Sequence, residues 1–469
     1  MDGPVAVIGG GWAGCAAAVE LARSGHRVEL YESAPVLGGR ARRVMRDGLA
    51  LDNGQHLLLG AYRETIALVA ALRSEGEGSA WAKSALTMGP LAREQHNALA
   101  LTARALPAPF GLALGLLGAS GLSVTERLAT LRWFARLRRG RFRVAPGATV
   151  STMLAGVPRR AREWLWEPLC LAALNTPPRR ASAQVFANVL QAAFDAGADD
   201  ASLVLPRIDL GDALPDPAAR WLRANGHAVH TATPARVLAI GADGVDIDVR
   251  GRRLRRRAAI VAVGPHQLHT AFDRGLAQGN PQIAAALRAT GRLNYEPITT
   301  LYLGYAAEHR LPRGLVRLDD APGQWIFDRS DILARAAARD AAGPAGLARS
   351  LYAVVISASG PQDDLGHPAL VAAVDAQLRR SSPGLPPLCW SQVIAERRAT
   401  YACVPDLPRP RCGRLAGRVH LAGDYTSEEL PATLEAAVRS GSAAATALAD
   451  DLRSGCAAGA AARGSTRVP

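Results

Sequence analysis

The first forty residues alternate between strand-like and helix-like hydrophobic patterns. Val5–Ile8 is an unbroken apolar run with the length and β-branching of a parallel strand that is buried on both faces. Residues 15–23 (CAAAVELAR) then place small and apolar residues at helical spacing, and Ser24-Gly25 ends that helix. A second strand follows at residues 27–31 (RVELY). This order of strand, helix and strand predicts an α/β domain of the Rossmann type.

Similar patterns return twice, far along the chain. Strand-like runs recur at residues 226–240, 245–249 and 257–264, and residues 252–257 between the last two read as a solvated basic turn. A further strand ends at Gly423, before a helix that starts near Pro431. The Rossmann-type domain is therefore expected to be discontinuous.

The length of 469 residues is too great for a single core and favours at least two domains. We expect a second α+β domain, which holds the substrate, between the pieces of the first. The predicted boundaries are residues 1–74, 216–288 and 409–451 for the Rossmann-type domain, residues 75–215 and 289–408 for the substrate domain, and residues 452–469 for a disordered tail.

The first strand runs into a glycine motif, G-x-G-x-x-G, at Gly9, Gly11 and Gly14. Gly9 permits a tight turn, Gly11 lets a pyrophosphate approach the main chain, and Gly14 lets the helix pack closely on the strand. Trp12 and Ala13 open that helix, whose N-terminal amides favour an anion.

Glu32 closes the second strand at the position where an acidic side chain would bind a ribose 2′-hydroxyl. An acidic residue there argues against the 2′-phosphate of NADP. A glycine-rich turn without a ligand is the simpler alternative, but the surrounding pattern favours a dinucleotide site, with NAD and FAD as the two candidates.

Composition excludes several other classes of function. The net charge is +14, yet only one of the 55 basic residues, Lys83, is a lysine, and no basic stretch alternates with aromatic residues as single-stranded nucleic acid binding would require. The six cysteines contain no C-x-x-C pair, so neither a metal site nor a disulfide framework is expected. The chain enters its first strand at once, which leaves no room for a signal peptide and predicts a cytoplasmic protein.

An apolar and basic stretch lies in the first part of the substrate domain. Residues 106–122 are almost wholly apolar, but they are short for a membrane span and are interrupted by prolines and glycines. Residues 123–144 mix apolar residues with arginines, as a helix at a membrane surface would. A buried lid with a solvated basic face is the alternative. We expect peripheral contact of residues 106–144 with a membrane.

The next glycine turn, Leu37-Gly38-Gly39-Arg40, resembles that of the flavoprotein superfamily that includes amine oxidases and carotenoid desaturases. The resemblance implies FAD, with Arg40 supplying positive charge near the diphosphate. Residues 419–441 resemble the second fingerprint of the same superfamily. The resemblance to this superfamily implies that the Val237 main chain contacts the adenine. The second fingerprint implies further FAD contacts from Gly423, Asp424, Leu430, Thr433 and Leu434.

Residues 52–65 (DNGQHLLLGAYRET) narrow the resemblance to the hydroxysqualene dehydroxylase family of hopanoid-producing bacteria. That family implies reductive removal of the hydroxyl group of hydroxysqualene to give squalene, with hydride from reduced FAD reaching an allylic cation. Gln55 and His56 are then expected near the flavin, and the alternative for His56 is a core histidine whose hydrogen bonds are satisfied by the main chain. The candidate proton donors are His56, Glu296 and Glu429. The resemblance implies a C30 isoprenoid substrate but names no electron donor.

Three other readings remain open. A carotenoid-type desaturase would share the fold and cofactor. An amine oxidase usually has a lysine near the flavin, well into the chain, whereas Lys83 lies in the first segment of the substrate domain. A flavoprotein that presents isoprenoid lipids without catalysis belongs to a third class.

Overall fold

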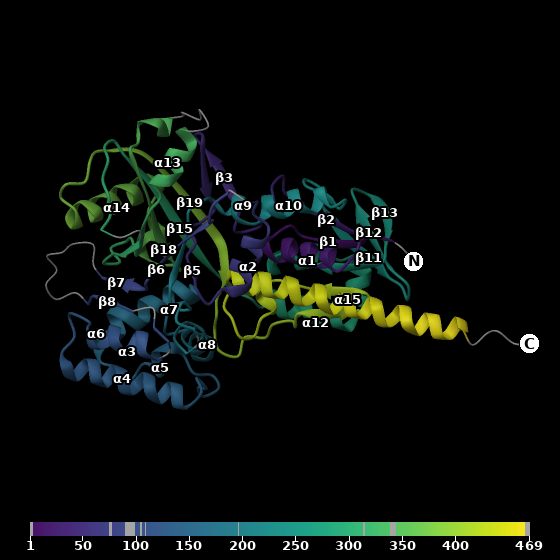
Figure 1. The fold of residues 1–469 in the computed structure, drawn as a ribbon, viewed down its shortest axis with the longest axis horizontal. Coiled ribbons are helices and arrows are strands. Elements are labelled where there is room, and N and C mark those ends of the chain that lie inside the picture. Colours follow the sequence, from purple (N-terminus) through teal and green to yellow (C-terminus); the bar gives the residue numbers. More distant parts are fainter. Residues whose placement is uncertain are drawn as a thin grey trace, which may run out of the picture.

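A computed structural model describes residues 3–74, 77–89, 99–103, 106–107, 109–195, 197–312, 315–337 and 344–464. Figure 1 shows a Rossmann-type region beside two further lobes, one built on a long antiparallel sheet and one helical. Residues 1–2, 75–76, 90–98 and 465–469 are among the parts of the chain outside this description.

The first sheet has six strands in the order β10-β2-β1-β14-β21-β20. All its pairings are parallel except that of β20 with β21. Three distant parts of the chain therefore share one sheet. Its strands are β1 (Val5–Ile8), β2 (Val28–Tyr31), β10 (Ala228–His230), β14 (Ala258–Val261), β20 (Gly413–Ala416) and β21 (Val419–Leu421).

The central strands of this sheet are buried on both faces, which explains why they read as continuous apolar runs. In β1, Val5 and Val7 face the cluster that holds α1 (Trp12–Arg23) and α15 (Leu434–Gly464), whereas Ala6 and Ile8 face the opposite cluster. The period of two along the strand thus separates two layers of side chains.

The two helices α1 and α15 pack along one another on one face of the sheet (Figure 1). They approach so closely that a Cβ atom on Gly441 of α15 would lie 2.1 Å from the Ala13 carbonyl oxygen of α1. Only glycine fits there. The first and last parts of the domain are therefore joined main chain to main chain.

The opposite face of the Rossmann sheet carries a three-stranded antiparallel sheet of β11 (Ala235–Ile240), β12 (Val245–Val249) and β13 (Arg252–Arg256). The strand-like run at residues 226–240 forms two strands, β10 and β11, which belong to different sheets. The prediction of a basic turn at residues 252–257 is wrong. Its arginines find carboxylates: Arg253 and Arg255 pair with Asp246.

The second large sheet has the order β16-β17-β18-β15-β19 and is antiparallel. One face packs on α14 (His367–Ser381), and the other contributes Trp325 and Phe327 to the main core. Its strands are β15 (Tyr295–Tyr305), β16 (Leu315–Arg317), β17 (Trp325–Asp328), β18 (Ser350–Ser357) and β19 (Leu388–Tyr401).

Helices and short strands complete the molecule. The short strands are β3 (Arg43–Arg46), β4 (Leu49–Asp52), β5 (Leu58–Leu59), β6 (Trp81–Ser84), β7 (Thr87–Met88), β8 (Leu101–Thr102) and β9 (Leu203–Pro206). The helices of the helical lobe are α3 (Phe110–Leu117), α4 (Val124–Arg139), α5 (Val150–Met153), α6 (Arg159–Ala161), a π-helix (Arg162–Trp166), α7 (Glu167–Leu174) and α8 (Ala183–Phe194). Elsewhere lie α2 (Arg63–Ala71), α9 (Leu210–Ala213), α10 (Pro215–Ala224), α11 (Arg274–Gly279), α12 (Pro281–Gly291), α13 (Ser330–Ala337), and 3₁₀ turns at Pro265–Thr270, Pro344–Leu347, Pro361–Asp364 and Asp424–Thr426.

The last helix corrects one prediction. Residues 452–469 were expected to be a disordered tail, but α15 continues to Gly464, since this stretch is rich in alanine, the best helix former. Residues 465–469 lie outside the described part. Across the described residues, no helix is both long enough and apolar enough to cross a bilayer.

Candidate functional site

The first glycine turn is built to leave the N-terminus of α1 open. Gly9 has a φ of +105°, which favours glycine, and a Cβ atom on Gly14 would lie 1.8 Å from the Gly9 carbonyl oxygen. Gly11 precedes α1, and no side chain in the described chain caps that end, which also has no acidic residue in its first turn. Free amides at a helix N-terminus form a site for an anion.

The second glycine turn packs directly on the first. The Gly38 N–H donates to the Gly10 carbonyl at 2.8 Å, and Gly38 has a φ of +110°. A Cβ atom on Gly39 would lie 3.2 Å from the Gly11 Cα. The two turns therefore form one wall of a cradle, with main-chain atoms facing its interior.

Glu32 stands at the end of β2 beside this cradle and is 9 % exposed. Its two carboxylate oxygens accept hydrogen bonds from the Gly10 N–H at 2.7 Å and the Ala34 N–H at 2.8 Å. These amides fix the carboxylate and leave further lone pairs for a ligand hydroxyl. The arrangement fits the ribose contact predicted from the sequence.

Arg40 joins the cradle to the end of β21. Its guanidinium donates to Asp424 Oδ1 at 2.6 Å and to the Ala399 carbonyl at 2.9 Å. Burial alone would lower the pKa of Arg40, but the Asp424 carboxylate outweighs burial and raises it. Arg40 therefore keeps its positive charge beside the anion site.

The N-terminus of α15 reaches the same cavity. Thr433 and Leu434 line it, and the Thr433 hydroxyl accepts from the Ala436 N–H at 3.1 Å. Leu430 does not line the cavity: its carbonyl accepts from the Tyr401 hydroxyl and from Arg409. The contact predicted for Leu430 is therefore not seen.

A buried group of three side chains holds the segment that begins at Asp52. Asp52 is fully buried, its Oδ1 accepts from the Leu210 N–H at 2.7 Å, and its Oδ2 lies 3.6 Å from Arg329 Nη2. The Tyr302 hydroxyl donates to the Asp52 carbonyl at 3.1 Å. Burial raises the pKa of Asp52 to about 6.

Asn53 links this segment to the second glycine turn. Its Nδ2 donates to the Arg40 carbonyl at 3.1 Å and to Glu396 Oε2 at 3.0 Å. Asn53 and Glu396 both line the cavity, and neither was predicted from the sequence. A single Asn or Glu in a sequence does not indicate a site, and only the fold, through β19, brings Glu396 beside Asn53.

Gln55 and His56 follow and line the cavity, as expected. His56 Nδ1 donates to the Gly54 carbonyl at 2.7 Å, which fixes the tautomer because a carbonyl only accepts. Burial lowers the pKa of His56, the Gly54 hydrogen bond partly opposes this, and Arg40 lowers the pKa further. The ring is therefore neutral near pH 7, with Nε2 as an acceptor.

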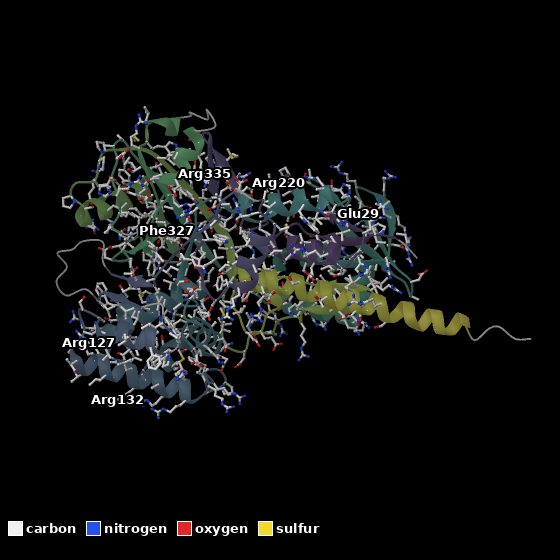
Figure 2. All side chains as sticks on the ribbon, viewed as in Figure 1. Glu29, Arg127, Arg132, Arg220, Phe327 and Arg335 are labelled. Atoms are coloured by element: carbon white, nitrogen blue, oxygen red, sulfur yellow. The ribbon has the colours of Figure 1, made fainter. Side chains whose placement is uncertain are left out.

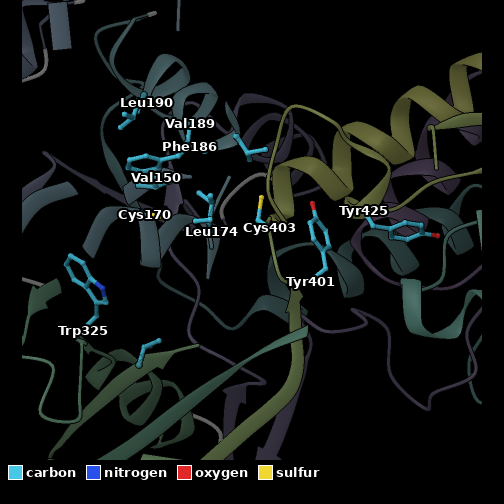
Figure 3. Close-up of a cluster of buried hydrophobic side chains, with 14 of the residues drawn as sticks. Val150, Cys170, Leu174, Phe186, Val189, Leu190, Trp325, Tyr401, Cys403 and Tyr425 are labelled. Carbon is cyan, nitrogen blue, oxygen red and sulfur yellow. The ribbon is translucent and has the colours of Figure 1, made fainter. Parts of the chain in front are cut away.

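A cavity of about 720 Å³ extends from the glycine turns into the lobes beyond. Its far walls are mostly apolar and come from α7, α8 and the antiparallel sheet. Figure 3 shows Phe186, Val189 and Leu190 gathered on α8, with Trp325 set across from them on the sheet. The apolar lining includes Met88, Leu169, Phe186, Val189, Leu190, Phe194, Ile298, Leu315, Trp325, Phe327 and Val355.

The structure brings most predicted site residues to this cavity. Those that line it are Gly9, Gly11, Trp12, Ala13, Glu32, Gly38, Gly39, Arg40, Gln55, His56, Gly423, Asp424, Thr433 and Leu434. Gly14 lies behind the wall, where it allows the helix to pack on the turn.

Two predicted acids and one main-chain contact are not brought there. Glu296 is 3 % exposed, pairs with Arg180, and lines a separate cavity of about 370 Å³. The Glu429 side chain is 76 % exposed and lies 3.9 Å from Arg439. The Val237 N–H and C=O bond Ala271 and Asp273, so the preceding residues line the cavity instead. These positions correct the expectations for the three residues.

The apolar wall of α8 was also missed, although its signal was present. Among the apolar residues of the preceding helical stretch, Leu169 lines the cavity, whereas Trp166 is fully buried in the helical core. The residues 186, 189, 190, 193 and 194 that line the cavity follow the i, i+3, i+4 spacing of one helix face. Helical spacing alone does not say which apolar face borders a cavity.

The open amides, the glycine cradle, Glu32 and Arg40 together fit a dinucleotide, and the apolar walls fit a large hydrocarbon. Across the described residues, no group of three or more His, Cys, Asp and Glu side chains is placed to hold a metal ion. The cradle therefore fits an organic dinucleotide cofactor, and the apolar part of the cavity lies beside it.

Comparison with known proteins gives consistent matches. Residues 12–449 match the family described as flavin containing amine oxidoreductase. The chain is 28 % identical over 463 residues to the hydroxysqualene dehydroxylase of Rhodopseudomonas palustris, covering 95 % of this chain and 98 % of that protein. It is 26 % identical to the enzyme of that name from Sinorhizobium fredii, covering 95 % and 98 %. These matches confirm the resemblance seen in the sequence.

Solved structures agree with the fold. An oxidoreductase from Methanosarcina mazei superposes with a TM-score of 0.69 at 15 % identity, covering 94 % of this chain and 99 % of that one. Cyclohexylamine oxidase from Brevibacterium oxydans gives 0.66 at 18 % identity, covering 97 % and 100 %. The predicted α/β fold with a Rossmann-type cofactor domain is confirmed.

Proposed function

This chain belongs to the flavin-containing amine oxidoreductase family, as an oxidoreductase with FAD as its cofactor, and we propose that it removes the hydroxyl group of hydroxysqualene to give squalene. The observation that carries the proposal is the similarity to hydroxysqualene dehydroxylases along nearly the whole chain. The large apolar cavity beside the dinucleotide cradle supports it, because a C30 hydrocarbon needs such walls.

Two related activities fit less well. Matches to zeta-carotene desaturases, such as that of Zea mays, cover only 14 % of this chain and 12 % of that protein. An amine oxidase would place a lysine near its flavin, but Lys83 lies on β6, 3.9 Å from Asp199, and does not line the cavity.

The proposed reaction needs orientation, dryness and one proton. The apolar walls from α8 and the antiparallel sheet align the hydrocarbon and exclude water. The hydroxyl is allylic, so its loss as water leaves a delocalised cation on the substrate. FAD, when bound in its reduced form, supplies the hydride that completes the product.

His56 is the proton donor in this proposal. Among the three candidate acids, only His56 lines the cavity, and its Nε2 is not used in the hydrogen bond to Gly54. The acid form is the imidazolium. Since burial lowers the pKa of His56, that form is scarce at neutral pH.

The rate at which hydroxysqualene is reduced to squalene should therefore fall as pH rises, roughly tenfold for each pH unit above the pKa of His56. The midpoint should lie below the ordinary value of 6.5, because the pKa is lowered. Single-turnover rates of the holoenzyme between pH 5 and 8 measure this. In His56→Gln the rate should drop about 100-fold and lose this pH dependence. An unchanged profile in the variant would assign the proton to another group.

We further propose that the protein works at the inner face of the cytoplasmic membrane, where its substrate is dissolved. Helix α3 and the start of α4 form a surface that suits this proposal. On α3, Phe110 is 62 % exposed, and Leu114 and Leu117 lie on the same face at helical spacing. On α4, exposed Val124 and Leu128 lead along one face to Arg132.

Charge and position support this apolar face. Figure 2 shows Arg127 and Arg132 on α4, at the outer edge of the helical lobe. Arginines beside an apolar helix face suit an anionic lipid surface. The inner side of α3 contacts β8, which pairs with β7, whose Met88 lines the cavity. Helix α3 is thus connected through β8 and β7 to the lining of the cavity.

The double variant Leu114→Glu, Leu117→Glu should reduce co-sedimentation with anionic liposomes at least about tenfold, because both exposed leucines would lose their apolar contribution to partitioning into the lipid surface. Turnover in detergent should persist. Leu365→Glu, a change at a residue of similar exposure far from α3, serves as the control. Equal liposome binding by the natural protein, the double variant and Leu365→Glu would show that this surface does not contact the membrane.

A single turnover tests the reaction itself. The flavin is reduced without oxygen, hydroxysqualene is added in detergent, and squalene is assayed while flavin absorbance is followed. The expected result is one squalene for each flavin that is reoxidised. Untouched alcohol beside a reduced flavin would contradict the proposal, and polyene oxidation by the oxidised enzyme would then favour a desaturase.

A further inference from the structure

One buried acceptor in the cavity has no partner in the described chain. Gln55 is 8 % exposed and its Oε1 is fully buried without a hydrogen bond. The Nε2 of the same side chain donates to the His56 carbonyl at 3.0 Å, which fixes the orientation of the amide. The main-chain N–H of Gln55 is also engaged, with the Thr300 hydroxyl at 3.3 Å.

An unpaired buried carbonyl oxygen is unusual in a folded protein, and it calls for a partner. The segment that carries Gln55 is firmly held, because Asp52 is bonded to Leu210 and Tyr302 at its start. The amide therefore cannot relax easily toward water. Gln55 lines the cavity, so a ligand in the cavity is the group placed to supply the missing donor.

The chemistry of the neighbouring group narrows the choice of donor. In its neutral form His56 offers only the Nε2 lone pair, since Nδ1–H is held by the Gly54 carbonyl. Both residues line the cavity, whose distant walls are apolar, and each has an acceptor atom, Gln55 Oε1 and His56 Nε2. An alcohol satisfies this arrangement because its O–H donates once while its oxygen lone pairs stay free.

We propose that Gln55 Oε1 accepts the hydrogen bond of the substrate hydroxyl, and that Gln55 is the residue by which the enzyme distinguishes the alcohol from the hydrocarbon product. This inference rests on the proposed function. With its O–H on Gln55, the alcohol turns a lone pair outward, where protonated His56 can donate to it. Gln55 is a positioning and specificity residue, and His56 moves the proton.

The same contact favours release of the product. Squalene has no O–H group. When squalene occupies the cavity, the Gln55 oxygen therefore stays without a hydrogen-bond partner and is also shielded from water. A site built around a substrate hydroxyl discriminates strongly against the analogue that lacks it. We expect the oxidised holoenzyme to bind the alcohol at least about tenfold more tightly than the hydrocarbon.

The test compares ligand binding in the oxidised holoenzyme, where no turnover occurs, by the change in flavin absorbance. Hydroxysqualene is paired with squalene, and farnesol is paired with the hydrocarbon that lacks its hydroxyl group. Gln55→Leu should lower the preference for the alcohol about tenfold in both pairs, mainly through weaker alcohol binding. Gln55→Asn should restore part of it. Gln282→Leu, the same change on the exposed start of α12, should leave the preference unaltered.

Two results would overturn the inference. The first is equal weakening of alcohol and hydrocarbon, which would mean that Gln55 only shapes the cavity. The second is weaker FAD binding or a shifted flavin spectrum without ligand, together with an unchanged preference, which would place the Gln55 oxygen on the cofactor. A third combination separates this inference from the proposed function. If Gln55→Leu loses the preference for farnesol over its hydrocarbon while the natural enzyme fails in the single turnover, the contact between Gln55 and a hydroxyl group is retained and hydroxysqualene is rejected as the substrate.

Discussion

Replacing Gly11 with alanine is expected to give a protein that folds normally and binds FAD about 100-fold more weakly, a change of ~3 kcal/mol. Gly11 has a φ of −71°, which alanine adopts freely, and the new Cβ would lie 3.9 Å from the Gly39 Cα, an ordinary contact. The methyl group therefore strains nothing in the protein. It would occupy the place where the glycine motif predicts that the pyrophosphate approaches the main chain.

Gly14→Ala is the matched comparison, because it adds the same methyl group three residues later. There the Cβ would lie 1.8 Å from the Gly9 carbonyl oxygen, so we expect a loss of about 3 kcal/mol of folding stability. Urea unfolding of the apoproteins and titration with FAD separate the two effects. Equal FAD affinity in Gly11→Ala and the natural protein would show that the pyrophosphate lies elsewhere.

Arg329→Leu is expected to lower the free energy of unfolding by about 3–5 kcal/mol, the usual cost of removing one partner from a buried ion pair. Arg329 is 5 % exposed and lies beside Asp52, which is fully buried. The guanidinium also bonds the Pro206 and Ile208 carbonyls. Activity should fall with stability, because Asp52 anchors the segment that carries Gln55 and His56.

The double variant Asp52→Asn, Arg329→Gln should recover part of the lost stability, since it leaves no unpaired charge and the asparagine oxygen still accepts from the Leu210 N–H. Chemical unfolding of Asp52→Asn, Arg329→Gln and the double variant, each compared with the natural protein, measures the coupling. Full additivity of the single effects would mean that the two side chains do not act as a pair.

The pH dependence of stability offers a further check on Asp52. Burial raises its pKa from 3.8 to about 6, so between these values the folded protein holds a proton that the unfolded chain has released. The contribution of this group is therefore fully present below about pH 4 and is lost as pH rises through 6, a total of about 3 kcal/mol. Asp52→Asn should flatten that part of the profile.

The cofactor cradle was predictable from the sequence because its parts are local. Gly9, Gly11 and Gly14 act within a single turn, and Glu32 lies one strand away along the sheet. The resemblance extended this to Arg40 and Asp424, which lie 384 positions apart in sequence and meet at 2.6 Å. Motif spacing thus located the residues that the main chain itself positions.

The substrate side could not be predicted in the same way, because tertiary packing decides it. Glu296 looked like a candidate acid, but its β-strand turns the carboxyl group toward Arg180 and away from the large cavity. Glu396 on the partner strand β19 reaches the cavity instead. Likewise, the arginines of β13 form a strand because Asp246 on β12 lies opposite them.

The contact of α15 with α1 has a consequence for biosynthesis. The cradle needs Asp424 and the N-terminus of α15, and α15 is seated through the glycine at position 441 against Ala13. A nascent chain therefore makes its first strand, helix and glycine turns long before it can complete the site. FAD is therefore expected to load after the ribosome has released the C-terminal helix, and a chain truncated before that helix is expected to remain apoprotein.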